Sequence, residues 1–250
     1  MAPVSTLSFK CALITGGGGG IGRAMAEALI AMGKSVIIAG RTESSLKKVA
    51  TDIEITFKHP ELDCLINNAG VQRPFQILGP DYVFDLEKAD QEIDTVAGWI
   101  HTNIRGPMHL SVGMVPHVNG LPNGGVIMNV SSALGFNPFS IVNPVYNGSK
   151  AWVHFFTMNL RTQLRQAGSK IKVVEIAPPT VETALHRERK DPDDNKKEHG
   201  NKGALSVEEF MEQIVEAWKE DKDIYTAGMG KEIVGKWYEA FGKAYSKAEG

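Results

Sequence analysis

The chain has 250 residues, of which 42% are hydrophobic and 22% charged, with a net charge of −2 at pH 7. This balance excludes a strongly basic surface for nucleic acid, and no apolar run reaches the roughly 20 residues that a membrane-spanning helix needs. Two cysteines, Cys11 and Cys64, are too few for a disulfide framework and are expected to be buried thiols. We therefore expect a cytoplasmic protein with one domain over 1–250, whose partners are neither nucleic acid nor membrane.

The first 40 residues predict a βαβ unit. Lys10–Thr15 is a short apolar run, five glycines follow it, and Ile21–Met32 carries apolar residues at helical spacing. Ser35–Gly40 is a second short run rich in β-branched residues. Units of this kind build parallel sheets with right-handed crossovers.

The alternation continues to the end of the chain. Further strands are predicted at 62–67, 125–131, 171–176 and 224–227, and helices at 86–118, 145–166, 207–219 and 231–247. Gly106-Pro107 should kink the first of these helices, and Ser206 with Glu209 forms a capping box for the third. The expected fold is α/β, with a doubly wound, Rossmann-like parallel sheet. The polar stretch at 186–202 predicts a solvated, mobile loop on the substrate side, with a lid over the substrate cleft as the alternative.

The glycine run lies between a predicted strand and a predicted helix, where a glycine pattern has a physical meaning. Glycine permits positive φ and lets the backbone approach a pyrophosphate, which the helix N-terminus then favours. Arg41 follows the second strand where an acidic residue would select NAD, so it can pair a 2′-phosphate. NADP is the expected cofactor, with NAD as the alternative.

Tyr146 and Lys150 are one helical turn apart and can therefore point into the same cleft. A free phenol has a pKa near 10, which Lys150 and the positive ring of an oxidised nicotinamide would lower. Ser131-Ser132 ends the preceding strand, where a hydroxyl can hold a substrate oxygen. Each of these features is common alone, and their combination carries the argument.

Taken in order, Thr15–Gly22, Asn67–Gly70, Asn103, Ser132, and Tyr146 with Lys150 resemble the motif set of the short-chain dehydrogenase/reductases. The resemblance covers nearly the whole chain. It implies that Tyr146 is the general acid/base, that Ser132 rather than Ser131 orients the substrate carbonyl, and that Asn103 holds a water of the proton relay. It also implies a set of cofactor-binding residues: Gly16, Gly20, Ile21, Gly22, Arg41, Asn68, Ala69, Gly70, Tyr146, Lys150, Pro178 and Thr183.

One departure from the family is large. Only Thr42–Glu61 separates the second strand from the strand that leads into Asn67, about half the length that the family uses for a helix, a strand and a second helix. We therefore expect the usual third strand to be missing or truncated, which leaves a bare edge on the second strand and fewer contacts to adenine. A smaller departure is Pro178-Pro179, which stands where the family has Pro-Gly.

Two hypotheses follow. The first is an oxidoreductase that moves a hydride between a nicotinamide and a small-molecule alcohol or carbonyl substrate. The second, prompted by the short 42–61 segment, is a non-catalytic nucleotide-binding or scaffold protein, or an impaired, poorly folded variant. Phe136, Phe139, Ile141 and Val142 either line an apolar substrate pocket or belong to the core or an interface. No metal site is expected, and the resemblance implies a homo-oligomer.

Overall fold

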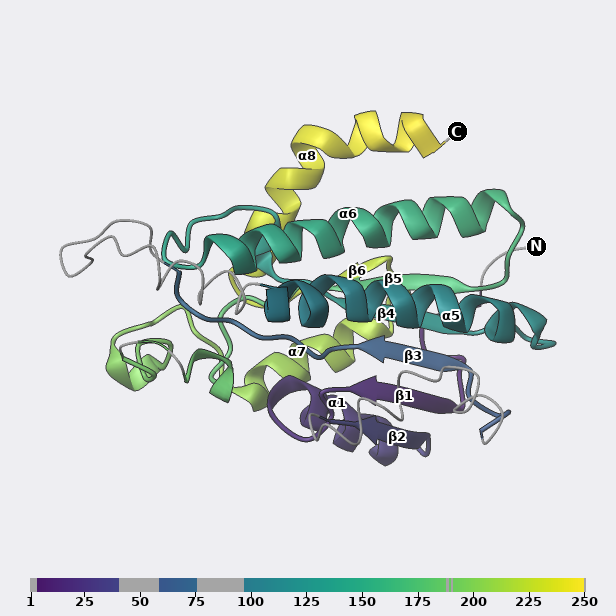
Figure 1. Cartoon of the computed structure of the whole chain (residues 1–250), viewed down its shortest axis with the longest axis horizontal. Helices are drawn as coiled ribbons and strands as arrows, with labels where there is room; N and C mark the ends of the chain where they lie inside the picture. The colour runs from purple at the N-terminus through teal and green to yellow at the C-terminus, as the bar shows by residue number, and fades with distance from the viewer. Residues whose placement is uncertain (1–3, 41–58, 76–96, 188, 190, 250) are drawn as a thin grey trace.

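Six parallel strands form the centre of the part of the chain that the structure describes, in the order β2-β1-β3-β4-β5-β6 (Figure 1). The computed structural model describes residues 4–40, 59–75, 97–187, 189 and 191–249. The strands are β1 Cys11–Thr15, β2 Ser35–Ala39, β3 Cys64–Asn67, β4 Val126–Val130, β5 Lys172–Ile176 and β6 Ile224–Tyr225. All described strand pairs are parallel, as the alternating sequence predicts.

Helices cover both faces of this sheet, and alternate residues of each strand explain why. On one face, Ala12 and Ile14 of β1 share a core with residues of α1 (Gly20–Ala31) and α7 (Val207–Trp218). On the other face, Cys11 and Leu13 share a second core with residues of α5 (Gly106–Gly120) and α6 (Pro144–Gln166). Strands buried on both sides read as continuous apolar runs. The doubly wound, Rossmann-like fold expected from the sequence is thereby confirmed.

The last helix, α8 (Gly230–Glu249), attaches to the outside of α6 (Figure 1). Its Tyr245 hydroxyl donates to the Met158 carbonyl of α6 at 2.8 Å. The α7 N-terminus has the expected capping box, since the Glu209 amide donates to Ser206 Oγ and the Ser206 amide donates to the Glu209 carboxylate. Both cysteines are buried free thiols, as the sequence predicts.

The break expected at Gly106-Pro107 takes the form of a π-helix, η1 (His101–Arg105), which runs directly into α5. Pro107 is the second residue of α5, where a missing N–H is tolerated. The irregular turn therefore precedes the proline. The early part of the predicted 86–118 helix lies outside the described residues.

The expected loss of a third strand also concerns 41–58, outside the described residues. Among the residues that the structure does describe, β2 pairs with β1 alone.

The polar segment at 186–202 contains the end of a short 3-10 turn, η3 (Ala184–His186), and a second, η4 (Lys197–His199). Its Asn195 is buried, and the Lys197 amide donates to Glu182 at 2.8 Å. Its mobility stays a prediction. Among the residues described, no helix combines the length and the apolar character needed to cross a bilayer.

Candidate active site

A cavity of about 900 Å³ opens at the carboxyl ends of the strands. From β1 the sheet runs to β2 on one side and to β3 on the other, so the strand order reverses at this point. Parallel sheets bind ligands at such a switch point. The cavity wall includes every described residue of the predicted catalytic and cofactor set except Asn103: Gly16, Gly20, Ile21, Gly22, Asn68, Ala69, Gly70, Ser132, Tyr146, Lys150, Pro178 and Thr183.

The glycine turn after β1 has a conformation that only glycine adopts readily. Gly16 has φ 68° and Gly20 has φ 52°, both in the left-handed region. Gly22 has ordinary φ but no room: a Cβ there would lie 2.3 Å from Asn68 Nδ2 and 2.4 Å from the Gly16 carbonyl oxygen. By contrast, a Cβ at Gly18 or Gly19 would meet nothing within 4 Å. The turn is therefore tightly packed beneath and open towards the cleft.

Asn68, which follows β3, holds this turn in place. Its side-chain amide donates to the carbonyls of Thr15 at 3.0 Å and Gly16 at 3.3 Å. The Thr15 hydroxyl in turn accepts from the backbone amides of Asn68 and Ala69, both at 3.1 Å. These bonds tie the ends of β1 and β3 together across the switch point.

The N-terminus of α1 faces the same cavity. Gly19 is its N-cap residue and supplies no side chain to cap the first amides, and the first turn carries no acidic residue. Unpaired amides at a helix N-terminus, together with the helix dipole, favour an anion. The residues present therefore fit a diphosphate lying across the turn.

The first two turns of α6 carry Tyr146 and Lys150, and both side chains are buried at the cavity wall. Lys150 Nζ donates to the Val130 carbonyl at 2.7 Å and lies 5.7 Å from the centre of the Tyr146 ring. Ser132, the N-cap residue of the short 3-10 turn Ala133–Gly135 after β4, lines the same cavity, and its hydroxyl acts to lower the pKa of Tyr146. The predicted phenol, ammonium and serine hydroxyl therefore converge on one cleft.

Burial dominates the electrostatics of this group. It raises the pKa of Tyr146 to about 12, against the opposing effects of the Ser132 hydrogen bond and the Arg189 charge. Burial also lowers the pKa of Lys150 to about 8, with Glu175 acting in the opposite direction. The pKa of Tyr146 therefore lies above that of a free phenol, because desolvation outweighs the effects of Ser132 and Arg189 at this depth. The lowering expected from Lys150 together with an oxidised nicotinamide stays a prediction.

The two serines after β4 have different surroundings. The Ser131 hydroxyl donates to the buried carboxylate of Glu175 on β5. Glu175 also contacts His154 Nδ1 at 2.8 Å, with both side chains fully buried. The Ser132 hydroxyl has only a long contact to the Pro178 carbonyl at 3.4 Å and accepts from the Leu134 amide. Ser132 is the serine whose hydroxyl faces Tyr146.

Asn103 lies in the π-helix behind the cleft, 1% exposed. Its side-chain amide donates to the Val71 carbonyl and to the Ser149 hydroxyl, and its oxygen accepts from the Val71 amide, all at 2.9–3.0 Å. The side chain is therefore committed to fixing the segment after β3 against α6. Gly70 lies between it and Lys150, since a Cβ there would be 3.5 Å from Lys150 Nζ and 3.6 Å from Asn103 Oδ1.

The segment after β5 closes the cleft. The Pro178 carbonyl accepts from the Ala133 amide at 2.9 Å, and the Thr183 methyl would lie 3.3 Å from a Cβ at Gly20. Arg41, predicted to read the 2′-phosphate, lies outside the described residues.

Sequence reasoning missed several residues of this site. Glu175 was detectable as the one acidic residue in the apolar run Ile171–Ile176, but its partners Ser131 and His154 come from distant segments. Arg189 lines the cavity and pairs with Asp194 at 2.6 Å. Nothing in the polar segment distinguished it from its charged neighbours.

Known proteins match this chain in sequence and in fold. A family model described as short chain dehydrogenase matches residues 10–59 and 53–194. A relative in Bacillus subtilis strain 168, "Uncharacterized oxidoreductase DltE", is 32% identical over 235 residues, covering 86% of each chain. A solved short-chain dehydrogenase from Sphingobium yanoikuyae in complex with NADPH has a TM-score of 0.72 at 19% identity, covering 96% of this chain and 95% of its own. A Burkholderia phymatum enzyme in complex with NAD has the same TM-score at 20% identity, covering 96% of both chains.

Proposed function

Because the chain belongs to the short-chain dehydrogenase family, we propose that it is an NAD(P)-dependent oxidoreductase that moves a hydride between its cofactor and an alcohol or carbonyl carbon. The convergence of Tyr146, Ser132 and Lys150 on a cavity that also contains the glycine turn carries this proposal. Relatives of the same fold bind NADPH and NAD. We propose NADP as the preferred cofactor because Arg41 follows β2, with NAD as the alternative.

Different residues of the cavity would bind different parts of the dinucleotide. The amides at the start of α1 and the open glycines Gly18 and Gly19 would hold the diphosphate. Lys150 would hold the nicotinamide ribose, and Thr183 would contact the nicotinamide amide. When bound, the cofactor supplies or accepts the hydride at its nicotinamide ring.

Tyr146 moves the proton. With a pKa near 12 its phenol is protonated at neutral pH, which suits a general acid that donates to a carbonyl oxygen as the alcohol forms. Ser132 would hold that oxygen beside the phenol. In the reverse direction Tyr146 must act as a base, and Lys150, mostly protonated below pH 8, supplies the charge that favours the phenolate. Asn103 is proposed to hold the water that resupplies the proton.

Calorimetric titration with NADPH and NADH tests the proposal against a non-catalytic role. We expect NADPH to bind with micromolar affinity and to be oxidised in the presence of a ketone. A chain that binds neither nucleotide at millimolar concentration would contradict the proposal. A chain that binds NADPH but reduces no ketone or aldehyde would favour the scaffold alternative. A homo-oligomer stays a prediction, testable by sedimentation of the same sample.

A further inference from the structure

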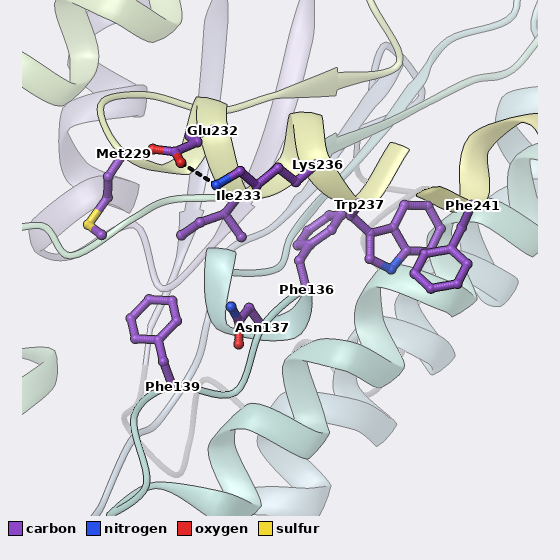
Figure 2. A pocket seen from close by; sticks show the side chains of 9 residues that line it. All are labelled: Phe136, Asn137, Phe139, Met229, Glu232, Ile233, Lys236, Trp237 and Phe241. Carbon is purple, nitrogen blue, oxygen red and sulfur yellow. Dashed lines mark hydrogen bonds and ion pairs between the residues drawn. The ribbon is translucent and has the colours of Figure 1, made fainter. Parts of the chain in front are cut away.

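A second cavity of about 460 Å³ lies beside the catalytic cleft, between α8 and the loop that precedes α6 (Figure 2). Most of its lining is apolar or aromatic. Its nine residues are Phe136, Asn137, Phe139, Met229, Glu232, Ile233, Lys236, Trp237 and Phe241. We call this cavity the aromatic groove. Its volume is within the range of small-molecule sites, about 300–1,000 Å³.

The groove is continuous with the catalytic cleft. Phe139 and Met229 line both cavities. Figure 2 shows these two side chains at one end of the groove and Phe241 at the other, with Phe136 and Trp237 in between. A molecule held at Tyr146 can therefore extend past Phe139 and Met229 towards Phe241.

The far wall of the groove is a packed aromatic cluster. The Trp237 ring meets Phe136 edge-on at 5.8 Å between centroids and lies 5.4 Å from Phe241. It also packs edge-on against the buried His154 at 4.7 Å. These contacts hold Trp237 in one orientation, so the wall exists before any ligand arrives and little ordering is needed on binding.

Both ends of the groove expose apolar surface to solvent. Phe139, Met229 and Phe241 are 49%, 44% and 56% exposed. Neighbouring exposed apolar side chains of this size commonly mark a binding site. The charged residues of the lining, Glu232 and Lys236, form an ion pair with each other on the rim (Figure 2). The groove therefore presents no net charge to its occupant and favours a neutral apolar group.

From this geometry we infer that the aromatic groove binds the apolar substituent of the substrate, which is a ketone or secondary alcohol with an extended alkyl or aryl group. This inference rests on the proposed function, because it places the carbonyl at Tyr146. Burial of each added methylene is worth up to about fourfold in kcat/KM. Because the groove is open, each methylene is only partly buried. We therefore expect kcat/KM to rise about two- to fourfold for each methylene added to the ketone, until its alkyl chain reaches Phe241.

A series of methyl ketones from 2-butanone to 2-decanone, assayed with NADPH, tests the inference. For the unaltered protein kcat/KM should rise along the series. In Phe241→Ala the rise should stop earlier, while 2-butanone is reduced at the same rate. The control is Phe155→Ala, which removes a phenylalanine that is 51% exposed and also faces Trp237, at 6.3 Å, but does not line the groove. This control should keep the full chain-length dependence.

The outcomes separate the two proposals. Turnover of all ketones at rates independent of chain length overturns the groove and leaves the proposed function standing. Absence of turnover contradicts the proposed function, and calorimetric binding of 2-decanone to the NADPH complex then tests the groove alone. Binding weakened by Phe241→Ala but not by Phe155→Ala supports it, and equal or undetectable binding in all three proteins overturns it. If Phe241→Ala instead dissociates an oligomer and leaves the chain-length dependence intact, the groove is a subunit interface and the inference is wrong.

Discussion

Replacement of Lys150 by methionine should raise the free energy of unfolding at neutral pH, although it removes a residue of the candidate active site. Lys150 is 4% exposed, and burial lowers its pKa from 10.5 to about 8. A difference of this size between folded and unfolded states corresponds to roughly 3 kcal/mol at pH 7, at 1.36 kcal/mol per pKa unit. Methionine fills a similar volume without a charge, but it loses the hydrogen bond to the Val130 carbonyl, which costs about 1 kcal/mol. We expect a net gain of about 2 kcal/mol.

The pH dependence gives this prediction a sign. Between pH 8 and 10.5 the unfolded lysine binds a proton that the folded one does not, so wild-type stability rises with pH over this window. Below pH 8 the lysine is protonated in both the folded and the unfolded state, so the full cost of burying its charge lowers wild-type stability. The advantage of Lys150→Met should therefore shrink as the pH rises and nearly vanish by about pH 9.5.

Urea unfolding of both proteins from pH 7 to 9.5 measures this difference. Lys243→Met, at an exposed lysine on α8, is the control and should change stability by less than about 0.5 kcal/mol at every pH. Two results would refute the claim that the buried Lys150 charge destabilises the fold: a Lys150→Met protein less stable than wild type at pH 7, or a stability difference that does not change with pH.

Two further predictions concern the cofactor. Gly22→Ala places a methyl group 2.4 Å from the Gly16 carbonyl oxygen, so it should lower stability by about 1–3 kcal/mol and weaken NADPH binding at least tenfold. The control is Gly148→Ala, at an exposed helical position where a Cβ meets nothing within 4 Å. It should raise stability by up to about 1 kcal/mol and leave NADPH affinity unchanged. Arg41→Asp should shift the NADPH-to-NADH affinity ratio at least tenfold towards NADH, as measured by calorimetry, because a carboxylate repels the 2′-phosphate; an unchanged ratio would mean that Arg41 does not contact the cofactor.

Local patterns were sufficient to predict most of the fold. Apolar runs such as Cys11–Thr15, glycine at a helix end such as Gly33, and the Ser206 capping box act within a few residues. These signals need no knowledge of the partner segment. The predicted strands and helices accordingly match the described ones to within a few residues, apart from the 86–118 helix, whose start lies outside the described residues and whose described part contains the π-helix.

Long-range contacts explain what the sequence did not predict. The π-helix is accompanied by contacts of Asn103 with Val71 and Ser149, residues 32 and 46 positions away. The Glu175 carboxylate is tolerated in a buried strand because Ser131 and His154 reach it from other elements. The direction of the Tyr146 pKa shift depends on depth of burial, which spacing along a helix does not reveal. Each of these features requires the assembled fold.

The central claim is that Tyr146 carries the proton in a hydride transfer, and its most direct test removes one oxygen atom. Tyr146→Phe, assayed by NADPH absorbance on a reduced ketone, should lower kcat by about 10²–10⁴-fold, the usual contribution of a general acid. The NADPH dissociation constant should stay within about threefold of wild type, because the ring and Lys150 remain. Equal turnover by Tyr146→Phe and wild type would contradict the account.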